Sequence, residues 1–226
     1  MSLLLHAIAP IEPAAPSPAG LRGQPVIAVD EQGLTAWTTD FHEAPGQLTR
    51  DDLLAHHGLI TQLHESLASV VPARFPTWVA DADALRRLIG SRRGELSSAL
   101  DTVRGRAELS VTAVWLTDDD AAAVSMPEAA TPGRRYLLER RQAFAGSDRR
   151  RQRAREVADQ IERLVGPDLV ESQRRVCPST AVAASMALLV PRLRAVEIMA
   201  RLPPVESGVR ILVNGPWPPY SFVDIG

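Results

Sequence analysis

Two histidines, His57 and His64, lie seven residues apart in a segment with helical periodicity, so both face nearly the same side of a helix. With Asp51 nearby, their side chains could hold a metal ion or carry out acid–base chemistry. A zinc site needs about four ligands, and the chain contains no His-Glu-x-x-His or Cys-x-x-Cys motif. The pattern therefore favours histidines that flank a buried stripe, and we predict no metal and no cofactor.

The single cysteine, Cys177, could act as a nucleophile with His42, His56 or Asp168 as its partner. None of these residues stands in a recognisable local signature, and Gly-x-Ser-x-Gly, Walker and Gly-x-Gly-x-x-Gly motifs are absent from the chain. A lone cysteine is usually a small buried residue, and without a partner it fits a reducing compartment. We predict that the protein is not an enzyme and has no small-molecule substrate.

All 25 basic residues are arginines, and many of them gather in one segment with a helical pattern. This cluster comprises Arg134, Arg135, Arg140, Arg141, Arg149, Arg150, Arg151, Arg153 and Arg155. Such clusters can bind phosphates or an acidic protein, but acidic residues interleave with them and the net charge is −2. The pattern is typical of a solvated helix face, and it favours an acidic protein partner over nucleic acid, which we do not expect as a partner.

The stretch from Asn214 to Val223 places two aromatic residues among three prolines, directly after an apolar strand pattern. Asn214-Gly215 predicts a turn, and the prolines hold the residues that follow extended. Its P-x-x-P spacing is one that SH3-type domains bind. Because the strand ties this stretch to the fold, packing on the protein's own surface is favoured over a partner contact, and both roles are compatible for Trp217, Pro218, Pro219 and Tyr220.

An arginine beside an aromatic residue, Arg74-Phe75, lies in a predicted strand. Such a pair can be a buried ion-pair anchor or an energetically important part of an interface. The sequence leaves both interpretations open.

The first half of the chain predicts an α+β unit. Strands are expected at 3–9, 26–29, 34–39 and 74–79, and a helix at 49–72 whose apolar stripe is Leu53, Ile60, Leu63, Leu67 and Val70. Thr49 and Asp52 have the spacing of a capping box at the start of that helix. A second helix begins at Asp81 or Asp83 and ends before Gly105.

From Glu108 onward the predicted order is β-α-β-β-α-β, the order of ferredoxin-like domains. Strands are expected at 109–115, 169–176, 182–190 and 209–213, a long arginine-rich helix that Gly146 interrupts, and a short helix at 191–202. The predicted fold class is therefore α+β with two domains, an N-terminal α+β domain (1–105) and a C-terminal ferredoxin-like domain (106–226).

The chain contains no apolar run that predicts a membrane span. The longest run, 181–190, is shorter than the ~20 residues that a spanning helix needs. Residues 1–9 lack the basic region of a signal peptide. We expect a cytoplasmic protein.

Four stretches, in order along the chain, resemble the gas vesicle GvpL/GvpF family. The most specific is Gly-Pro-Trp-Pro-Pro-Tyr-Ser-Phe at 215–222, which resembles the signature that closes members of this family. Leu3 to Ala9 resembles the opening strand, and Pro132 to Arg141 resembles the Gly-x-x-Tyr-Leu-x-x-x-Arg helix start. Pro72 to Thr77 resembles the central Pro-x-Arg-Phe-Gly-Thr stretch, except that Pro76 stands where the family usually has glycine.

This resemblance implies a minor component of the gas vesicle, located at the vesicle and in the cytoplasm. It implies that the protein contacts the small hydrophobic, GvpA-like shell subunit and other accessory proteins while the gas-filled shell nucleates or grows. We expect partner binding by Arg74, Phe75, Arg140, Arg141, Trp217, Pro218, Pro219 and Tyr220. The alternative is a nucleic-acid-associated regulatory protein that uses the arginine-rich helix.

Overall fold

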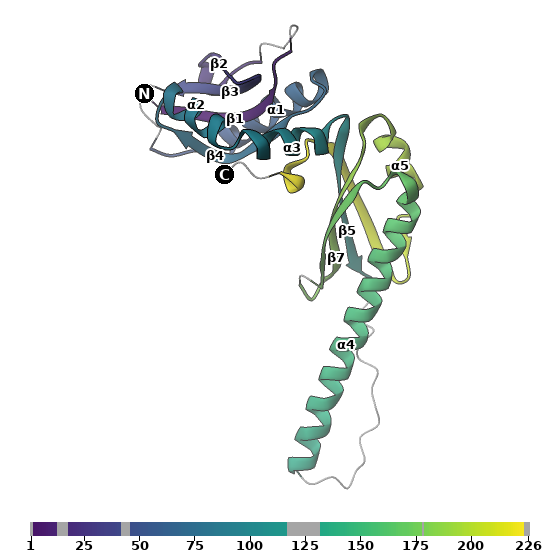
Figure 1. Cartoon of the computed structure of the whole chain (residues 1–226). Coiled ribbons are helices and arrows are strands. Elements are labelled where there is room, and N and C mark those ends of the chain that lie inside the picture. Colours follow the sequence, from purple (N-terminus) through teal and green to yellow (C-terminus); the bar gives the residue numbers. More distant parts are fainter. Residues whose placement is uncertain (1, 13–17, 42–45, 117–131, 178, 224–226) are drawn as a thin grey trace. The chain divides into compact units, whose positions relative to one another are not determined.

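The chain packs into two compact units. The computed structural model describes all residues except 1, 13–17, 42–45, 117–131, 178 and 224–226, and no side chain within 132–145. Unit 1 comprises Met1–Glu108, Leu189–Ala195 and Gly215–Gly226, and unit 2 comprises Leu109–Leu188 and Val196–Asn214. The aromatic tail therefore belongs to the unit that the N-terminal half of the chain builds (Figure 1). The domain boundary between residues 105 and 106 stays a prediction.

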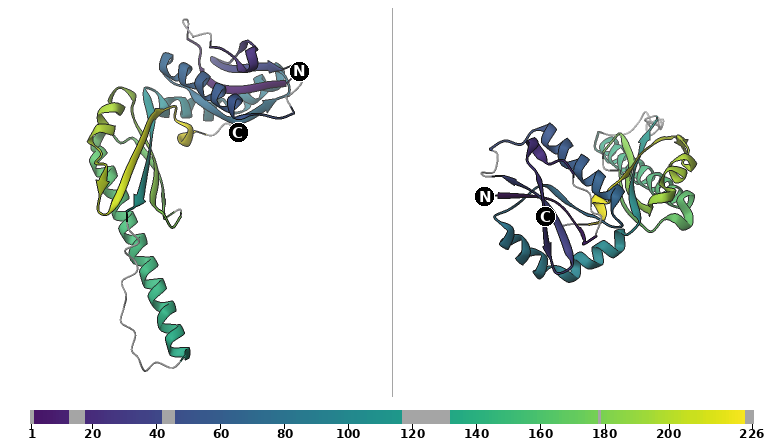
Figure 2. Two further views of the ribbon diagram at one scale, coloured as in Figure 1. Left: turned by 180° about the vertical axis from the view of Figure 1, so that it is seen from behind. Right: turned by 90° about the horizontal axis from the view of Figure 1, so that it is seen from above.

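Unit 1 is a sheet with helices on both faces. Its four strands are antiparallel in the order β2-β3-β1-β4, with the bounds β1 (Ser2–Pro10), β2 (Val26–Glu31), β3 (Leu34–Phe41) and β4 (Val71–Val79). One face packs on α1 (Arg50–Ser66), and the other packs on α2 (Ala82–Ser91) and α3 (Arg93–Val103) (Figure 2). Short 3-10 turns, η1 (Leu21–Gly23), η3 (Arg192–Arg194) and η4 (Tyr220–Phe222), complete the unit.

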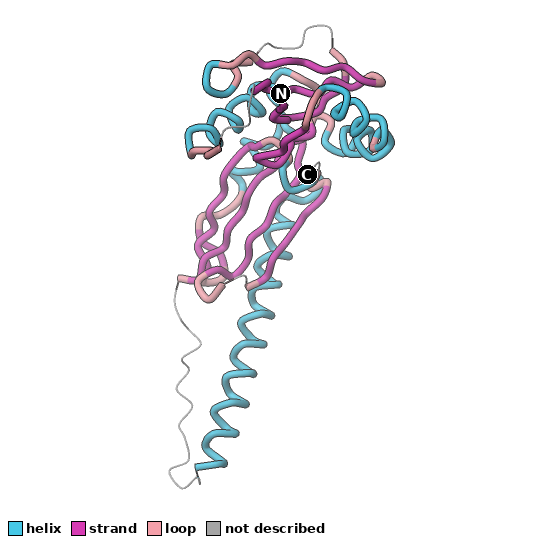
Figure 3. The backbone as a smooth tube through the Cα atoms, turned by 90° about the vertical axis from the view of Figure 1, so that its left-hand side faces the viewer, coloured by secondary structure: helices cyan, strands magenta, loops and turns pink. Residues whose placement is uncertain are grey.

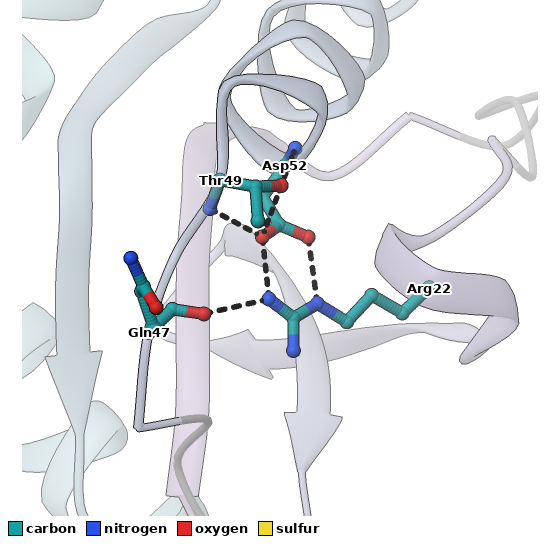
Figure 4. Close-up of polar contacts among 4 residues, drawn as sticks. All are labelled: Arg22, Gln47, Thr49 and Asp52. Atoms are coloured by element: carbon teal, nitrogen blue, oxygen red, sulfur yellow. Dashed lines mark hydrogen bonds and ion pairs between the residues drawn. The ribbon is translucent and has the colours of Figure 1, made fainter.

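A capping box starts α1, as the sequence predicts. The Thr49 hydroxyl accepts a hydrogen bond from the backbone N–H of Asp52 at 3.2 Å, and the Asp52 carboxylate accepts one from the backbone N–H of Thr49 at 2.8 Å. The same carboxylate accepts a hydrogen bond from the Nε–H of Arg22 at 2.7 Å, and this arginine also donates a hydrogen bond to the backbone carbonyl of Gln47 at 2.9 Å (Figure 4). The guanidinium holds the pKa of Asp52 well below its usual range, so the pair joins the helix start to η1.

The central strand β1 is buried on both faces, because helices cover both sides of the sheet, and its register shifts at His6. The shift lies between Leu5 and Ala7 in both pairings of β1. Leu5 and Ile8 pack on the α2 and α3 side, while Ala7 packs on the α1 side. Strict alternation would place Leu5 and Ala7 on one face, so the extra residue turns the second half of the strand over.

The single helix that the sequence predicts before Gly105 is two helices. α2 ends at Arg92, whose backbone angles of −108° and 16° leave the helical region, and α3 begins directly after it. Gly90 and Gly94 flank this break, and glycine lowers the stability of a helix interior. The break lets both helices turn an apolar side toward the sheet, with Ile89 on α2 and Leu100 on α3 buried in one cluster.

Unit 2 has the topology that the β-α-β-β-α-β order predicts. Its sheet runs β6-β7-β5-β9-β8, with the bounds β5 (Arg106–Trp115), β6 (Glu171–Val176), β7 (Val182–Pro191), β8 (Val205–Glu206) and β9 (Val209–Trp217). The helices are α4 (Pro132–Val165) and α5 (Ala195–Arg201), and a 3-10 turn, η2 (Gly166–Asp168), follows α4. Figure 3 shows α4 along one face of this sheet. The predicted α+β fold class with a ferredoxin-like part is confirmed.

Several details of unit 2 differ from the sequence prediction. Helix α4 continues through Gly146 without a break. The strand β8 carries no apolar alternation because it is only two residues long, and the sequence does not predict it. In the described part of the chain, no helix combines the length and apolarity that crossing a membrane requires.

Candidate interaction site

Unit 1 contains a pocket between α1 and β4 with a volume of about 420 Å³. Its lining comes from the first half of α1, from β4 and from the C-terminal tail, and comprises Leu53, Leu54, His56, His57, Ala73, Arg74, Phe75 and Tyr220. Three residues that the sequence singled out separately, Arg74, Phe75 and Tyr220, therefore lie together. We call this site the α1–β4 pocket. Its volume is within the range of about 300–1,000 Å³ that is typical of binding sites.

Two exposed leucines form part of this pocket. Leu53 is 47% exposed and Leu54 is 54% exposed, whereas Ile60 and Leu63 of the same helix are fully buried. The sequence prediction that Leu53 belongs to the buried stripe is therefore wrong, and Leu54 was not considered. Adjacent residues point to different sides of a helix. A Leu-Leu pair in the first turns was therefore the sequence signal that at least one of the two leucines could lie outside the buried stripe. Clustered exposed apolar side chains mark interaction surfaces more often than isolated ones.

The tail residues pack on unit 1, and we call Trp217 to Phe222 the C-terminal strap. Pro218 and Pro219 are buried, and Tyr220 packs against the apolar cluster under α1. The hydroxyl of Tyr220 shares a hydrogen bond of 2.9 Å with Nδ1 of His57. The Trp217 ring lies 5.4 Å from the His57 ring and stays 37% exposed. The strap therefore packs on its own protein and still presents an aromatic surface.

The turn expected at Asn214-Gly215 does not occur, because β9 continues to Trp217. Gly215 has a φ of 131°, a value that residues with a side chain rarely adopt, so glycine lets the strand continue here. The peptide bonds Gly215-Pro216 and Phe75-Pro76 are both cis, so each of the two sequence motifs around the pocket contains one.

A buried carboxylate holds the strap. Glu108, 7% exposed, accepts the backbone N–H of Ser221 at 2.7 Å and its hydroxyl at 2.8 Å. Burial raises the pKa of Glu108, while the two hydrogen bonds oppose that rise. Burial and then the charge of Glu108 raise the pKa of Tyr220, so the Tyr220 hydroxyl keeps its proton. No local sequence pattern points to Glu108, since its partner is 113 residues away along the chain.

A chain of buried polar groups lies behind the pocket. Nδ1 of His6 and Nδ1 of His56 are 2.8 Å apart, and Nε2 of His6 lies 2.7 Å from the Thr39 hydroxyl. Nε2 of His56 lies 3.3 Å from the carbonyl oxygen of Ala73. Burial, followed by the neighbouring His56, lowers the pKa of His6 to about 3, and burial lowers that of His56 to about 4. Both rings are therefore neutral at pH 7.

The histidines considered as ligands occupy separate places. His57 lies at the pocket, whereas His64 is buried beside Arg192, and burial lowers the pKa of His64 to about 4. Among the residues that the structure describes, no group of three or more His, Cys, Asp or Glu side chains could hold a metal ion. The side chain of Cys177 is partly exposed, unlike the buried cysteine that the sequence suggested.

The arginine-rich helix α4 belongs to unit 2. The side chains of Arg140 and Arg141 lie outside the described residues. Arg150 and Arg153 lie over the ring of Trp115, with 5.1 and 5.4 Å from the guanidinium carbon to the ring centre. Arg153 also donates to the carbonyl of Ser207 at 3.3 Å. These two arginines therefore contact other parts of unit 2, although Arg153 is also exposed. Arg149, Arg151 and Arg155 are exposed as well.

The sequence pattern of the family described as "Gas vesicle synthesis protein GvpL/GvpF" matches residues 3–224 of this chain. The chain belongs to the GvpL/GvpF family. The match includes all three segments of the α1–β4 pocket and the strap. The resemblance seen in the sequence motifs is confirmed.

Relatives in the GvpL/GvpF family carry both names at similar identity. Gas vesicle protein L2 of Halobacterium salinarum is 27% identical over 228 residues, which cover 87% of this chain and 80% of that protein. Gas vesicle protein F of a Streptomyces species is 29% identical over 220 residues, which cover 89% of each. The comparison thus identifies the family without choosing between L and F.

Solved GvpF structures share the fold. The crystal structure of GvpF from Anabaena sp. PCC7120 aligns with a TM-score of 0.81 at 18% identity, over 100% of this chain and 97% of that one. GvpF from Microcystis aeruginosa aligns with a TM-score of 0.77 at 17% identity, over 98% of both chains. The fold of this GvpL/GvpF chain is therefore known along its whole length.

Proposed function

We propose that this protein is an accessory protein of gas vesicle assembly that binds the small hydrophobic shell subunit at the α1–β4 pocket. Family membership supports the assembly role, and the observation that carries the binding site is the exposure of Leu53 and Leu54 beside Phe75. These side chains offer a partner apolar contact, and they are not of the types that carry out catalysis. The proposed places of action are the vesicle and the cytoplasm.

The proposed mechanism follows from the physics of an apolar subunit. Before assembly, a shell subunit exposes apolar surface that would aggregate, and a protein that covers this surface transiently can keep the subunit available. Completing the burial of a half-exposed leucine contributes roughly 1 kcal/mol, about half the value for full burial. Two such leucines support reversible binding, which suits a protein that must release the subunit to the shell.

The rim of the pocket adds polar and aromatic contacts to this proposal. Arg74 is an exposed guanidinium on β4, and Trp217 presents part of its ring at the strap. Arginine and tryptophan are common at the centres of protein interfaces, because each combines a large contact area with directional hydrogen bonding. We propose that α4, with Arg149, Arg151 and Arg155 exposed, forms a second surface for acidic accessory proteins, and that Arg140 and Arg141 of the same helix also bind them.

A binding experiment with matched leucine variants tests this proposal. The shell subunit from the same genome is captured by wild-type protein, by the double variant Leu53→Ser/Leu54→Ser, and by the control Leu193→Ser, which removes a leucine of unit 1 that is 98% exposed and outside the pocket. We expect the double variant to lose about tenfold or more in affinity and the control to bind like wild type. Equal binding by the double variant would exclude the pocket.

Salt separates the two proposed surfaces. Apolar binding at the pocket should survive about 1 M salt, where the Debye length falls to about 3 Å. The double variant Arg74→Ala/Trp217→Ala should weaken this salt-resistant binding while the protein stays folded. If that variant keeps full binding, Arg74 and Trp217 do not belong to the interface.

A further inference from the structure

The C-terminal strap forms one wall of the α1–β4 pocket, and it consists of the last residue of β9, two prolines and the turn η4. Tyr220 lines the pocket together with residues that come from α1 and β4. Strand β9 ends at Trp217, and the only regular structure after it within the described residues is the three-residue turn η4, which has no side-chain cap. A 3-10 turn of this length does not hold its own conformation, so tertiary contacts must fix the strap.

Contacts at Ser221 are suited to fixing the strap. The carboxylate of Glu108 receives both donors of this residue, the backbone N–H and the hydroxyl, at 2.7 and 2.8 Å. Hydrogen bonds to a charged group are stronger than neutral ones, and a carboxylate that takes two donors from one residue also fixes its orientation. Ser221 follows Tyr220 directly, so the orientation of the Tyr220 ring depends on this grip.

Contacts on the other side of the strap are of a different kind. Tyr220 meets His57 through one hydrogen bond, and Trp217 meets the same histidine through a ring contact while it stays partly exposed. His57 itself lines the pocket, so a partner in the pocket would touch this side of the strap. Glu108 does not line the pocket, and a bound partner therefore leaves its grip on Ser221 intact.

We propose that Glu108 is the positioning residue of the α1–β4 pocket: by holding Ser221 it keeps the strap docked, and a released strap removes the Tyr220 wall and with it the affinity for the shell subunit. This inference rests on the function proposed above for the pocket, and it assigns to Glu108 a role in binding without contact with the partner. The strap then acts as a hinged wall, and the fraction of protein molecules with a docked strap sets the fraction that can bind the shell subunit.

The test compares two glutamates that each accept a backbone N–H in unit 1. Glu108→Ala removes the grip on Ser221, whereas the control Glu12→Ala removes the carboxylate that accepts the N–H of Ala68 at 3.1 Å, away from the pocket. The conservative variant Glu108→Gln keeps an acceptor for the N–H and gains a donor for the hydroxyl oxygen. Each variant is measured for amide hydrogen exchange and for affinity to the shell subunit.

We expect Glu108→Ala to speed exchange of the Ser221 amide by roughly tenfold or more and to weaken binding by a similar factor, while amides of α2 and α3 exchange as in wild type. Glu12→Ala should change neither quantity, and Glu108→Gln should restore most of both. Faster exchange at Ser221 with unchanged binding would overturn the role of the strap as a wall. Unchanged exchange at Ser221 would overturn the role of Glu108 as its anchor.

A milder variant keeps the proposal open to refutation if Glu108→Ala does not fold. Ser221→Ala removes one of the two donors and leaves the backbone N–H in place, so we expect roughly threefold weaker binding or more, and no change would overturn the proposal. The function proposed for the pocket fails in a different way: either wild-type protein does not bind the shell subunit, or the double variant Leu53→Ser/Leu54→Ser binds it equally. The exchange rates of Ser221 would still decide whether Glu108 anchors the strap.

Discussion

His6 and His56 share a hydrogen bond of 2.8 Å whose direction follows from their outer partners. The carbonyl of Ala73 can only accept, so Nε2 of His56 carries a proton and donates to it. In a neutral ring Nδ1 of His56 is then an acceptor, and Nδ1 of His6 donates to it. Nε2 of His6 in turn accepts from the Thr39 hydroxyl. Each ring thus satisfies both nitrogens with a single proton, in a site that water does not reach.

An added proton breaks this chain, so we predict that stability falls as the pH falls. In the folded protein the pKa values of His6, His56 and His64 lie at about 3, 4 and 4, below the ordinary histidine value of 6.5. Between these folded-state values and pH 6.5, the unfolded chain therefore binds more protons than the folded protein. The stabilising contribution is complete above pH 6.5 and is lost as the pH approaches 4. Between about pH 7.5 and 5.5 we expect a loss of roughly 1 kcal/mol for each histidine, measured by urea unfolding.

The control for this pH experiment is the variant Glu108→Gln. The pKa of Glu108 is raised, so the folded protein becomes less stable as the pH rises and Glu108 loses its proton. The contribution of Glu108 to the pH dependence of stability therefore has the opposite sign to that of the histidines. The variant should show at least as steep a loss on acidification as wild type. A flat unfolding midpoint across this range in both proteins would contradict neutral buried histidines.

The capping box of α1 predicts a measurable stability effect. Thr49→Ala removes the acceptor for the Asp52 N–H and should lower the free energy of unfolding by about 1 kcal/mol. Asp81→Ala, which removes the acceptor for the Ala84 N–H at the start of α2, provides a second cap for comparison. Chemical unfolding of both variants gives the values. A Thr49→Ala protein as stable as wild type would show that Arg22 and Asp52 hold the helix start without the cap.

Trp115 should link α4 to the sheet of unit 2. Replacing Trp115 by leucine keeps an apolar side chain but removes the ring beneath Arg150 and Arg153, so we expect a loss of roughly 1–2 kcal/mol from two cation–π contacts. Trp37→Leu removes a buried ring for which the described residues show no such contact, and it is the comparison for the lost volume. If raising the salt concentration does not reduce the stability difference between wild type and Trp115→Leu, packing rather than charge explains the loss.

The salt dependence of binding at the exposed arginines of α4 distinguishes an acidic protein partner from nucleic acid. If α4 bound nucleic acid, the logarithm of the affinity would fall with that of the salt concentration by about 0.9 for each phosphate contacted. We expect no measurable binding of duplex DNA or RNA at about 150 mM salt, where the screening length is about 8 Å. A steep salt slope that disappears in the variant Arg149→Gln/Arg151→Gln/Arg155→Gln would instead support the nucleic-acid alternative.

Patterns within a short stretch of sequence predicted much of the fold, and they failed where distant residues decide. The spacing of Thr49 and Asp52 predicted the helix start, since both bonds lie within one turn. The sequence prediction does not contain the break at Arg92, because apolar spacing continues across it, although Gly90 and Gly94 on either side are a local signal for it. Leu53 was assigned to the core, since helical periodicity does not say which side of a helix meets the sheet.

The sequence by itself determined most of the elements, the fold class and the family, because strand and helix periodicities, caps and the closing Gly-Pro-Trp-Pro-Pro-Tyr-Ser-Phe motif depend on residues that are neighbours in the chain. Only the tertiary structure decided which residues meet. It brings Tyr220 to His57 across 163 positions and Ser221 to Glu108 across 113, and it places His6 against His56. Hydrogen bonds act over about 3 Å in space whatever the separation along the chain, so such pairs leave no spacing pattern in one sequence.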